Sequence, residues 1–380
     1  MPKPVRALDH TLSLADIHAA MARIRDSIYL SPCARSEDFS QHTGNSVYLK
    51  LDNLQRTGAF KERGALNKLL TLSTEERDRG VIAASAGNHA QGVAYHAGRH
   101  GIRAQIVMPL TTPLIKVSAT KGYGAEVVLH GANYDEACEE AVRRSEKLGM
   151  TFIHPFDDEV VMAGQGTMGL EILQQVPDVE AIIAPIGGGG LIAGVGCAVK
   201  ETNPRIRVIG VQPARLPSMK VALAEGHPVT LSPAATIADG IAVRRAGEKT
   251  LAEGAGAAAL AALINRKTSL NGNKVAVLVC GGNIDVSLLS RIMERGLVKD
   301  GRLVRLRVHL PDYPGALHRL TGILAQHRAN IVETSYDRAY YGVNLGDTAI
   351  DITMETRGPD HIAELLSALS ASGYAHERIL

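Results

Sequence analysis

The stretch TGAFKERGALNKLL, residues 57–70, places a lysine at the mouth of a helix. The helix is predicted by apolar residues at three- and four-residue spacing, namely Ala65, Leu66, Leu69 and Leu70. One turn back, this face reaches residue 61 or 62, and we expect Lys61, not the acidic Glu62, to face inward. Burial disfavours an ammonium ion, so an inward lysine becomes a neutral nucleophile. The alternative is a first-turn lysine whose stem extends to solvent.

Strand-like and helix-like segments alternate on both sides of this helix. The predicted strands are residues 46–51, 81–85, 103–109, 125–130, 150–156, 180–186, 205–212 and 274–280. Most are followed by a turn and a helical pattern, which predicts an α/β fold with a mostly parallel sheet and helices on both faces. Ligands bind such sheets beyond the carboxyl ends of the strands.

The pattern changes near residue 300. The order becomes strand, helix, strand pair, helix and strand, over residues 302–310, 314–327, 330–340, 347–356, 359–373 and 374–380. This βαββαβ order is that of ferredoxin-like domains. We therefore predict a domain boundary at about residues 298–302.

Composition limits the classes of partner. The 380-residue chain has a net charge of +2, no tryptophan and 4% aromatic residues, which argues against nucleic acids and anionic membranes. The cysteines Cys33, Cys138, Cys197 and Cys280 form no closely spaced pair, as expected of a reduced, cytoplasmic protein.

The uncharged residues 181–199 contain six glycines and a proline, and so predict a strand, a glycine loop and a helix instead of a membrane span. The amino terminus has no signal-peptide pattern.

The segment PIGGGGLIAGVG, residues 185–196, follows one of the predicted strands. Four consecutive glycines let backbone amides approach a phosphate, and the following helix adds its dipole. The segment nearly matches the GxGxxA dinucleotide pattern, which leaves a nucleotide-dependent oxidoreductase as an alternative. That alternative needs an acidic residue after the next strand, where the chain has Gln212, so a smaller phosphorylated cofactor fits better.

Two further segments follow strands. ASAGNHAQGVA, residues 84–94, places Ser85 to His89 at a strand-to-helix turn, where free amides attract anions such as a carboxylate. VLVCGGN, residues 277–283, ends a strand with Cys280. This thiol is either an ordinary buried strand-end cysteine or a weak hydrogen-bonding partner of a cofactor ring.

Together these motifs, with residues 236–245 and 253–263, resemble the pyridoxal-phosphate-dependent serine/threonine dehydratases over most of residues 10–300. The resemblance implies fold type II, the tryptophan-synthase-β-like fold, over residues 1–300, with a small lobe of about residues 46–155 inserted in the larger lobe. Residues 302–380, with DYPGALHRL at 312–320, resemble an ACT regulatory domain.

The resemblance also implies residue roles. Lys61 would hold pyridoxal 5'-phosphate as a Schiff base and take the α-proton. The phosphate would bind the amides of Gly187, Gly188, Gly189, Gly190 and Leu191. Asn88 would bind the ring hydroxyl and Cys280 would face the ring nitrogen. The substrate carboxylate would bind among Ser85, Ala86, Gly87, Asn88 and His89, and an effector at Asp312, Gly315 and Ala316.

The activity implied is that of a threonine ammonia-lyase of isoleucine biosynthesis, forming 2-oxobutanoate from L-threonine and pyruvate from L-serine. Related activities are serine racemase and hydroxyaspartate ammonia-lyase, but Ala86 stands where racemases of the group have a second serine. Relatives carry an extra strand and helix between residues 250 and 251. The loss of this strand and helix could displace Glu253. A catalytically impaired, pyridoxal-phosphate-binding regulatory protein is therefore an alternative to an active enzyme.

The resemblance gives further expectations about partners. The carboxylates that hold a divalent cation in several relatives are missing after residue 211, so no metal is predicted, although a monovalent ion held by carbonyls stays open. ACT pairs form across subunit interfaces, which predicts an allosteric homo-oligomer, a dimer or a tetramer.

Overall fold

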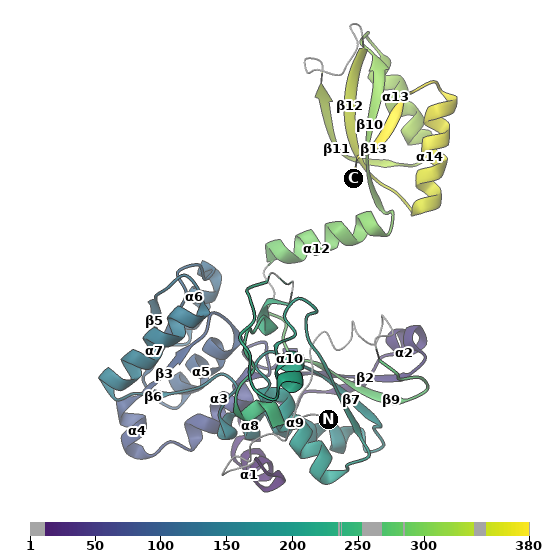
Figure 1. Cartoon of the computed structure of the whole chain (residues 1–380). Helices are drawn as coiled ribbons and strands as arrows, with labels where there is room; N and C mark the ends of the chain where they lie inside the picture. Colours follow the sequence, from purple (N-terminus) through teal and green to yellow (C-terminus); the bar gives the residue numbers. More distant parts are fainter. Residues whose placement is uncertain are drawn as a thin grey trace. The chain divides into compact units, whose positions relative to one another are not determined.

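The structure is a computed structural model that describes residues 12–234, 236, 238–252, 268–283, 286–337 and 347–379. The chain forms two compact units, residues 1–283 and 284–380, which are treated separately (Figure 1). The predicted α/β class is confirmed. Within the described residues, no helix is both long and apolar enough to span a membrane.

The larger sheet of the first unit has the strand order β1-β2-β9-β7-β8. Its strands are β1 (Cys33–Arg35), β2 (Ser46–Leu51), β7 (Ala181–Pro185), β8 (Arg207–Val211) and β9 (Lys274–Val279). In these pairings β1 is antiparallel to β2, whereas β2, β9, β7 and β8 are parallel to one another. The carboxyl ends of β7 and β9 therefore meet at one edge, which is where the glycine loop and Cys280 follow.

The smaller sheet is fully parallel, in the order β5-β4-β3-β6. Its strands are β3 (Val81–Ala84), β4 (Ala104–Met108), β5 (Glu126–Leu129) and β6 (Thr151–Phe152). The small lobe was expected to begin near residue 46, but β2 pairs with β9 in the larger sheet, so this sheet starts with β3.

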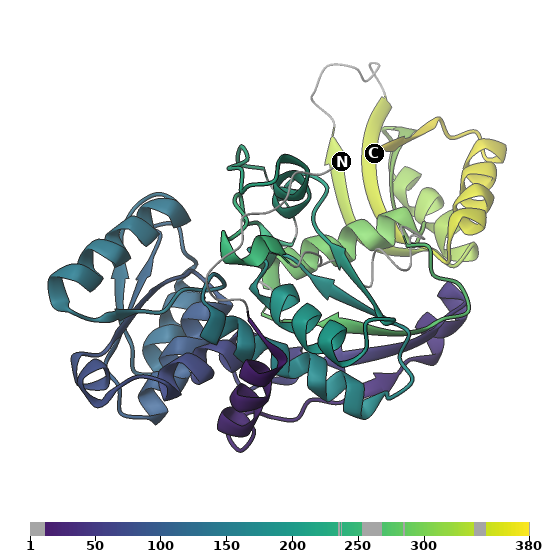
Figure 2. The same cartoon turned by 60° about the horizontal axis from the view of Figure 1, so that its bottom comes forward.

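Helices join the two sheets of this unit. α5 (Asn88–Arg99) packs on α3 (Lys61–Leu70), α3 on α8 (Glu159–Gln175), and α8 on α9 (Gly190–Thr202) (Figure 2). α8 is buried over most of its length. The remaining described helices of the unit are α1 (Leu14–Ile24), α2 (Glu37–Thr43), α4 (Thr74–Arg79), α6 (Leu114–Gly122), α7 (Tyr134–Leu148) and α10 (Ser218–Glu225), with short 3-10 turns at Asp52–Leu54, Asp239–Ile241 and Lys249–Ala252.

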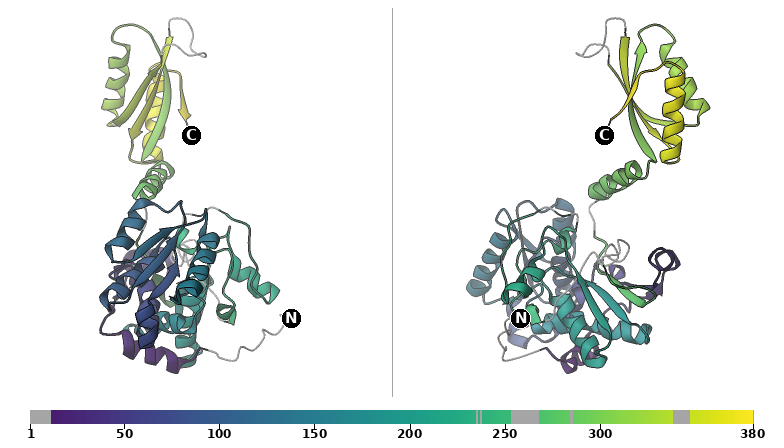
Figure 3. Two further views of the ribbon diagram at one scale, coloured as in Figure 1. Left: turned by 90° about the vertical axis from the view of Figure 1, so that its left-hand side faces the viewer. Right: turned by 45° about the vertical axis from the view of Figure 1, so that its right-hand side comes forward.

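The second unit has the predicted βαββαβ order. Its elements after α12 (Val286–Lys299) are β10 (Leu303–Pro311), α13 (Ala316–Gln326), β11 (Asn330–Asp337), β12 (Asp347–Glu355), α14 (Pro359–Ala371) and β13 (His376–Ile379). The sheet is antiparallel, in the order β11-β12-β10-β13, with both later helices on one face (Figure 3). The units separate after Asn283, before α12, and not at the expected residues 298–302. The difference arises because the sequence interpretation assigned no helix to 286–299.

Candidate active site

Lys61 is the first residue of α3, as expected from its place after the TGAF turn. Its side chain is partly buried, and its Nζ donates a hydrogen bond to the carbonyl oxygen of Pro155 at 2.7 Å. Burial lowers the pKa of Lys61 to about 8, and the nearby Cys280 only partly opposes this shift. The amine therefore becomes neutral, and so nucleophilic, at a pH where an ordinary lysine stays charged.

The neighbouring Glu62 corrects the sequence interpretation, which excluded it from the core. Glu62 has no exposed surface, and its Oε2 accepts a hydrogen bond from the amide of Thr57 at 2.9 Å. Its backbone lies against α5, where a Cβ on Gly92 would come within 3.1 Å of the Glu62 Cα. Burial raises the pKa of Glu62. An acidic residue is accommodated here because it closes the turn that precedes Lys61.

The glycine loop connects β7 to α9. Gly189 is the last loop residue before α9 and has a φ of +110°. No side chain caps the start of this helix. In the part of the chain that the structure describes, the amides of Gly187 to Leu191 donate no hydrogen bond to protein, whereas the Gly188 carbonyl accepts from Gly247 N and Thr250 Oγ1. A row of free amides at a helix start, with carbonyls turned away, is an anion site.

The turn from Ser85 to His89 connects β3 to α5, which begins at Asn88 without a side-chain cap. Nε2 of His89 lies 3.0 Å from the carbonyl oxygen of Ile153, so Nε2 carries the proton and Nδ1 is an acceptor. Burial first, and the charge of Lys61 second, lower the pKa of His89 to about 3. His89 is thus a neutral side chain beside Lys61.

Cys280 follows β9 and lies next to the turn that carries Lys61. Its carbonyl accepts a hydrogen bond from Phe60 N at 3.1 Å, and Ala59 and Gly281 form an isolated antiparallel bridge. Burial raises the pKa of the Cys280 thiol well above its usual value, so the group is neutral. Residues 57–61 and 280–283 are therefore held side by side.

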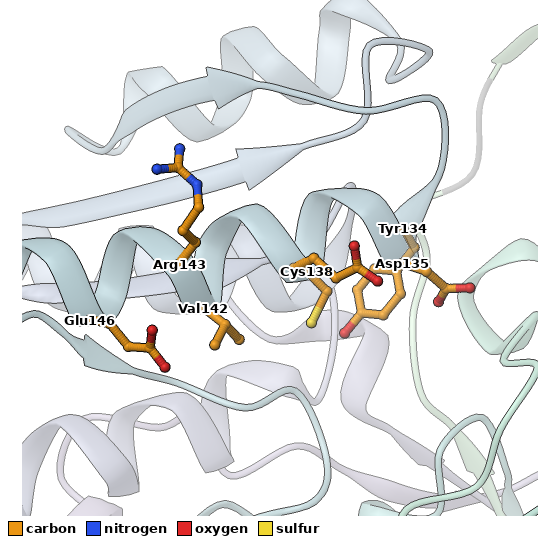
Figure 4. Close-up of a pocket in the computed structure, with 7 residues that line it drawn as sticks. Tyr134, Asp135, Cys138, Val142, Arg143 and Glu146 are labelled. Atoms are coloured by element: carbon orange, nitrogen blue, oxygen red, sulfur yellow. The ribbon is translucent and has the colours of Figure 1, made fainter.

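Lys61, the turn from Ser85 to His89 and Cys280 thus lie close together, and the glycine loop lies against Phe156, which follows the Pro155 that Lys61 contacts. The expected effector residues Asp312, Gly315 and Ala316 lie in the second unit, at the turn from β10 to α13, where Gly315 has a φ of +92°. Glu253 and residues 253–263 lie outside the described residues. A surface hollow along α7, from Tyr134 to Glu146, contains none of these segments (Figure 4).

The sequence interpretation missed the HPFDD segment, residues 154–158, that covers the glycine loop. A Cβ on Gly188 would lie 2.3 Å from the Phe156 ring, and one on Gly190 would lie 2.5 Å from the Phe156 carbonyl oxygen. Asp157 accepts from the amides of Glu248 and Lys249. The available signal was polar residues directly after a predicted strand, as in the segments that were recognised.

The residues present fit pyridoxal phosphate. The free amides of the glycine loop suit its phosphate, the nucleophilic amine of Lys61 suits its aldehyde, and a neutral thiol offers a weak partner for a ring nitrogen. Two sheets of mostly parallel strands, joined by helices and with this site at their strand ends, define the class of fold type II pyridoxal-phosphate enzymes.

Comparisons with known proteins agree with this class. Residues 24–251 match the family "Pyridoxal-phosphate dependent enzyme". The chain is 44% identical to the L-threonine ammonia-lyase of Thermotoga maritima over 96% of this chain and 98% of that one. It is 46% identical to the L-threonine ammonia-lyase of Geobacter sulfurreducens over 94% and 97%. The processed form of threonine deaminase isoform 2 from Solanum lycopersicum has a similar structure, with a TM-score of 0.70, 37% identity, and coverage of 77% and 97%.

This chain belongs to the pyridoxal-phosphate-dependent enzyme family, and its cofactor is pyridoxal phosphate. It is an enzyme related over most of its length to threonine ammonia-lyases. The alignment with the Thermotoga protein spans 395 positions, whereas 96% of these 380 residues is about 365. About 30 aligned positions of the relative therefore have no counterpart in this chain.

Proposed function

We propose that this chain is an L-threonine ammonia-lyase that converts L-threonine to 2-oxobutanoate and ammonia, and L-serine to pyruvate. The observation that carries the proposal is a partly buried lysine with a lowered pKa, bonded to Pro155, next to the Phe156 that covers a row of free loop amides. The near full-length likeness to two L-threonine ammonia-lyases supports the choice of substrate.

The roles of the residues follow from their chemistry. Bound pyridoxal phosphate supplies an aldehyde for covalent attachment and a ring that accepts electron density. The amides of residues 187–191 hold a phosphate, and the turn from Ser85 to His89 holds the substrate carboxylate at the start of α5. Lys61 Nζ, once neutral, takes the α-proton of the substrate. The neutral thiol of Cys280 cannot stabilise a positive charge on a ring nitrogen that faces it. The ring nitrogen would then stay unprotonated, which favours rapid loss of the β-hydroxyl.

The proposal is tested by mixing purified protein with each amino acid and measuring the keto acid released. We expect 2-oxobutanoate from L-threonine and pyruvate from L-serine. A yellow protein that carries the cofactor but releases neither keto acid would favour the catalytically impaired alternative. D-serine formed from L-serine would favour a racemase, against the absence of a second serine at Ala86.

The second unit is proposed to be an ACT domain that binds an amino-acid effector, and the enzyme to be a homo-oligomer. The proposal is supported by the βαββαβ order and by the exposed turn from β10 to α13, which contains Asp312 and Gly315. Coupling between two such sites is typically worth about 1–3 kcal/mol. Isoleucine or valine should then change the activity; unchanged activity and thermal stability with both would exclude these two effectors.

The pH dependence of covalent attachment provides one prediction. Because burial lowers the pKa of Lys61 to about 8, the neutral amine is absent at low pH and forms as the pH rises through about 8. We expect reductive trapping of pyridoxal phosphate on residue 61 of the cofactor-free protein to reach half its maximum near that pH. Peptide mapping locates the trapped pyridoxyl group at each pH. A yield on residue 61 that does not rise as the pH passes through about 8 would contradict the prediction.

The tight packing of the glycine loop provides another prediction. In Gly188→Ala the new Cβ would lie 2.3 Å from the Phe156 ring, so the ring or the loop must move. Such overpacking costs about 1–3 kcal/mol, so we expect cofactor affinity to fall by about 5- to 150-fold in fluorescence titrations. Gly122→Ala in α6, where no neighbouring atom lies within 4 Å of the new Cβ, is the control and should bind normally. Equal affinities in both variants would contradict the prediction.

A further inference from the structure

Asn283 connects two segments of the candidate site without a role in the proposed function. It ends the CGGN segment, and its Nδ2 donates hydrogen bonds to the carbonyl oxygen of Thr57 at 2.7 Å and to Oδ1 of Asn88 at 3.0 Å. One side-chain amide thus ties the turn before Lys61 to the turn after β3.

The backbone acceptor fixes both amide orientations. A peptide carbonyl only accepts, so Asn283 must present its NH₂ group to Thr57. The second hydrogen of that group points to Asn88, which must therefore present its oxygen. Nδ2 of Asn88 is left as a donor, and it has no hydrogen-bond partner among the residues that the structure describes.

The surrounding backbone is shaped to hold this pair of amides. Gly58 has a φ of +73°, and a Cβ there would lie 2.4 Å from Oδ1 of Asn283. A Cβ on Gly281 would lie 3.1 Å from Nδ2 of Asn88. The acceptor is itself anchored, because the amide of Thr57 donates to the buried Glu62. Both glycines thus provide the space that the two side chains occupy.

We propose that Asn283 is a positioning residue that holds Asn88 as a hydrogen-bond donor toward the ring hydroxyl oxygen of the cofactor. The inference rests on the proposed function, in which Asn88 binds that oxygen. A side chain that can only donate favours the deprotonated oxygen over the hydroxyl. Without Asn283, the Asn88 amide is free to rotate and present its own oxygen, which repels the deprotonated form.

The test measures cofactor affinity and the visible absorption spectrum of the holoenzyme. Asn283→Asp keeps the shape but cannot donate to Thr57 or Asn88 at neutral pH. Because hydrogen bonds to charged groups are stronger than neutral ones, we expect affinity to fall about 10- to 150-fold, which corresponds to about 1.5–3 kcal/mol. The visible band should also shift as the ring oxygen gains a proton. Asn271→Asp, at an exposed position, is the matched control and should change neither property.

A double-variant cycle separates positioning from a general loss of structure. If Asn283 acts through Asn88, the variant Asn88→Ala/Asn283→Ala should bind the cofactor as weakly as Asn88→Ala alone. Additive losses, or an Asn283→Asp protein with wild-type spectrum and affinity, would overturn the inference. Wild-type protein that binds no pyridoxal phosphate would instead overturn the proposed function together with the inference, so the two failures are distinguishable.

Discussion

Lys61→Ala is expected to abolish keto-acid release, with a fall in kcat of more than about 10⁴-fold. A positioned general base contributes about 10²–10⁴-fold, and the same amine is also the point of covalent attachment. Among the described residues, the ionisable side chains that interact electrostatically with this amine include Cys280, His89 and His154. None can take its place, because burial keeps the thiol protonated and lowers the pKa values of both imidazoles.

Two controls make this prediction specific. Lys61→Arg keeps the positive charge but cannot lose its proton, so it should be as inactive as the alanine variant. Lys147→Ala removes an exposed lysine from α7 and should leave activity unchanged. Activity is measured as 2-oxobutanoate formed from L-threonine, with folding checked by circular dichroism. If the alanine variant kept more than about one hundredth of wild-type activity, Lys61 would not be the base.

Arg63→Ala is expected to cause the largest loss of stability. The Arg63 side chain has no exposed surface; its guanidinium donates to both oxygens of Asp52 at 2.7 and 2.9 Å and of Glu171 at 2.6 and 2.9 Å. Lys50 Nζ also lies 2.6 Å from Glu171. Burial alone would raise the pKa of Asp52, but the Arg63 charge and hydrogen bonds hold it below its usual value. Removing the guanidinium leaves a buried carboxylate without its cation.

Breaking a buried ion pair from one side typically costs about 3–5 kcal/mol, and we expect a loss of that size in the free energy of unfolding. The measurement is urea denaturation of the full chain followed by circular dichroism. Arg143→Ala removes an arginine of the same charge whose side chain is 62% exposed, although it also pairs with a carboxylate, that of Glu140. That control should lose no more than about 1 kcal/mol. Equal losses in the two variants would show that burial does not govern the strength of these pairs.

Local patterns predicted the parts of the site that lie within a few residues of a strand end. The glycine run at residues 187–190, the turn at residues 85–89 and Cys280 each follow a recognisable strand. The carboxyl ends of parallel strands lie at the same edge of a sheet, so the sequence alone predicts that these segments lie together. The lysine was found because its helix begins directly after a turn.

Long-range partners explain what the sequence interpretation missed. The sequence interpretation kept Glu62 out of the core and assigned no position to Arg63, because charged side chains are rarely buried without partners. Their partners are remote or belong to a turn: Glu171 lies 108 residues from Arg63. Asn283 lies 195 residues from Asn88. No periodicity in the chain reports such pairs.

The sequence by itself determined the class of fold, the order of most strands and helices, and the segments that supply a lysine, free amides and a thiol. These follow from hydrophobic periodicity and glycine positions, which act over a few residues. The tertiary structure alone decided that Glu62 and Arg63 are buried, that Phe156 covers the glycine loop, and that Asn283 orients Asn88. Each of these depends on atoms brought together by folding, since a polar group is buried only where the fold supplies its partner.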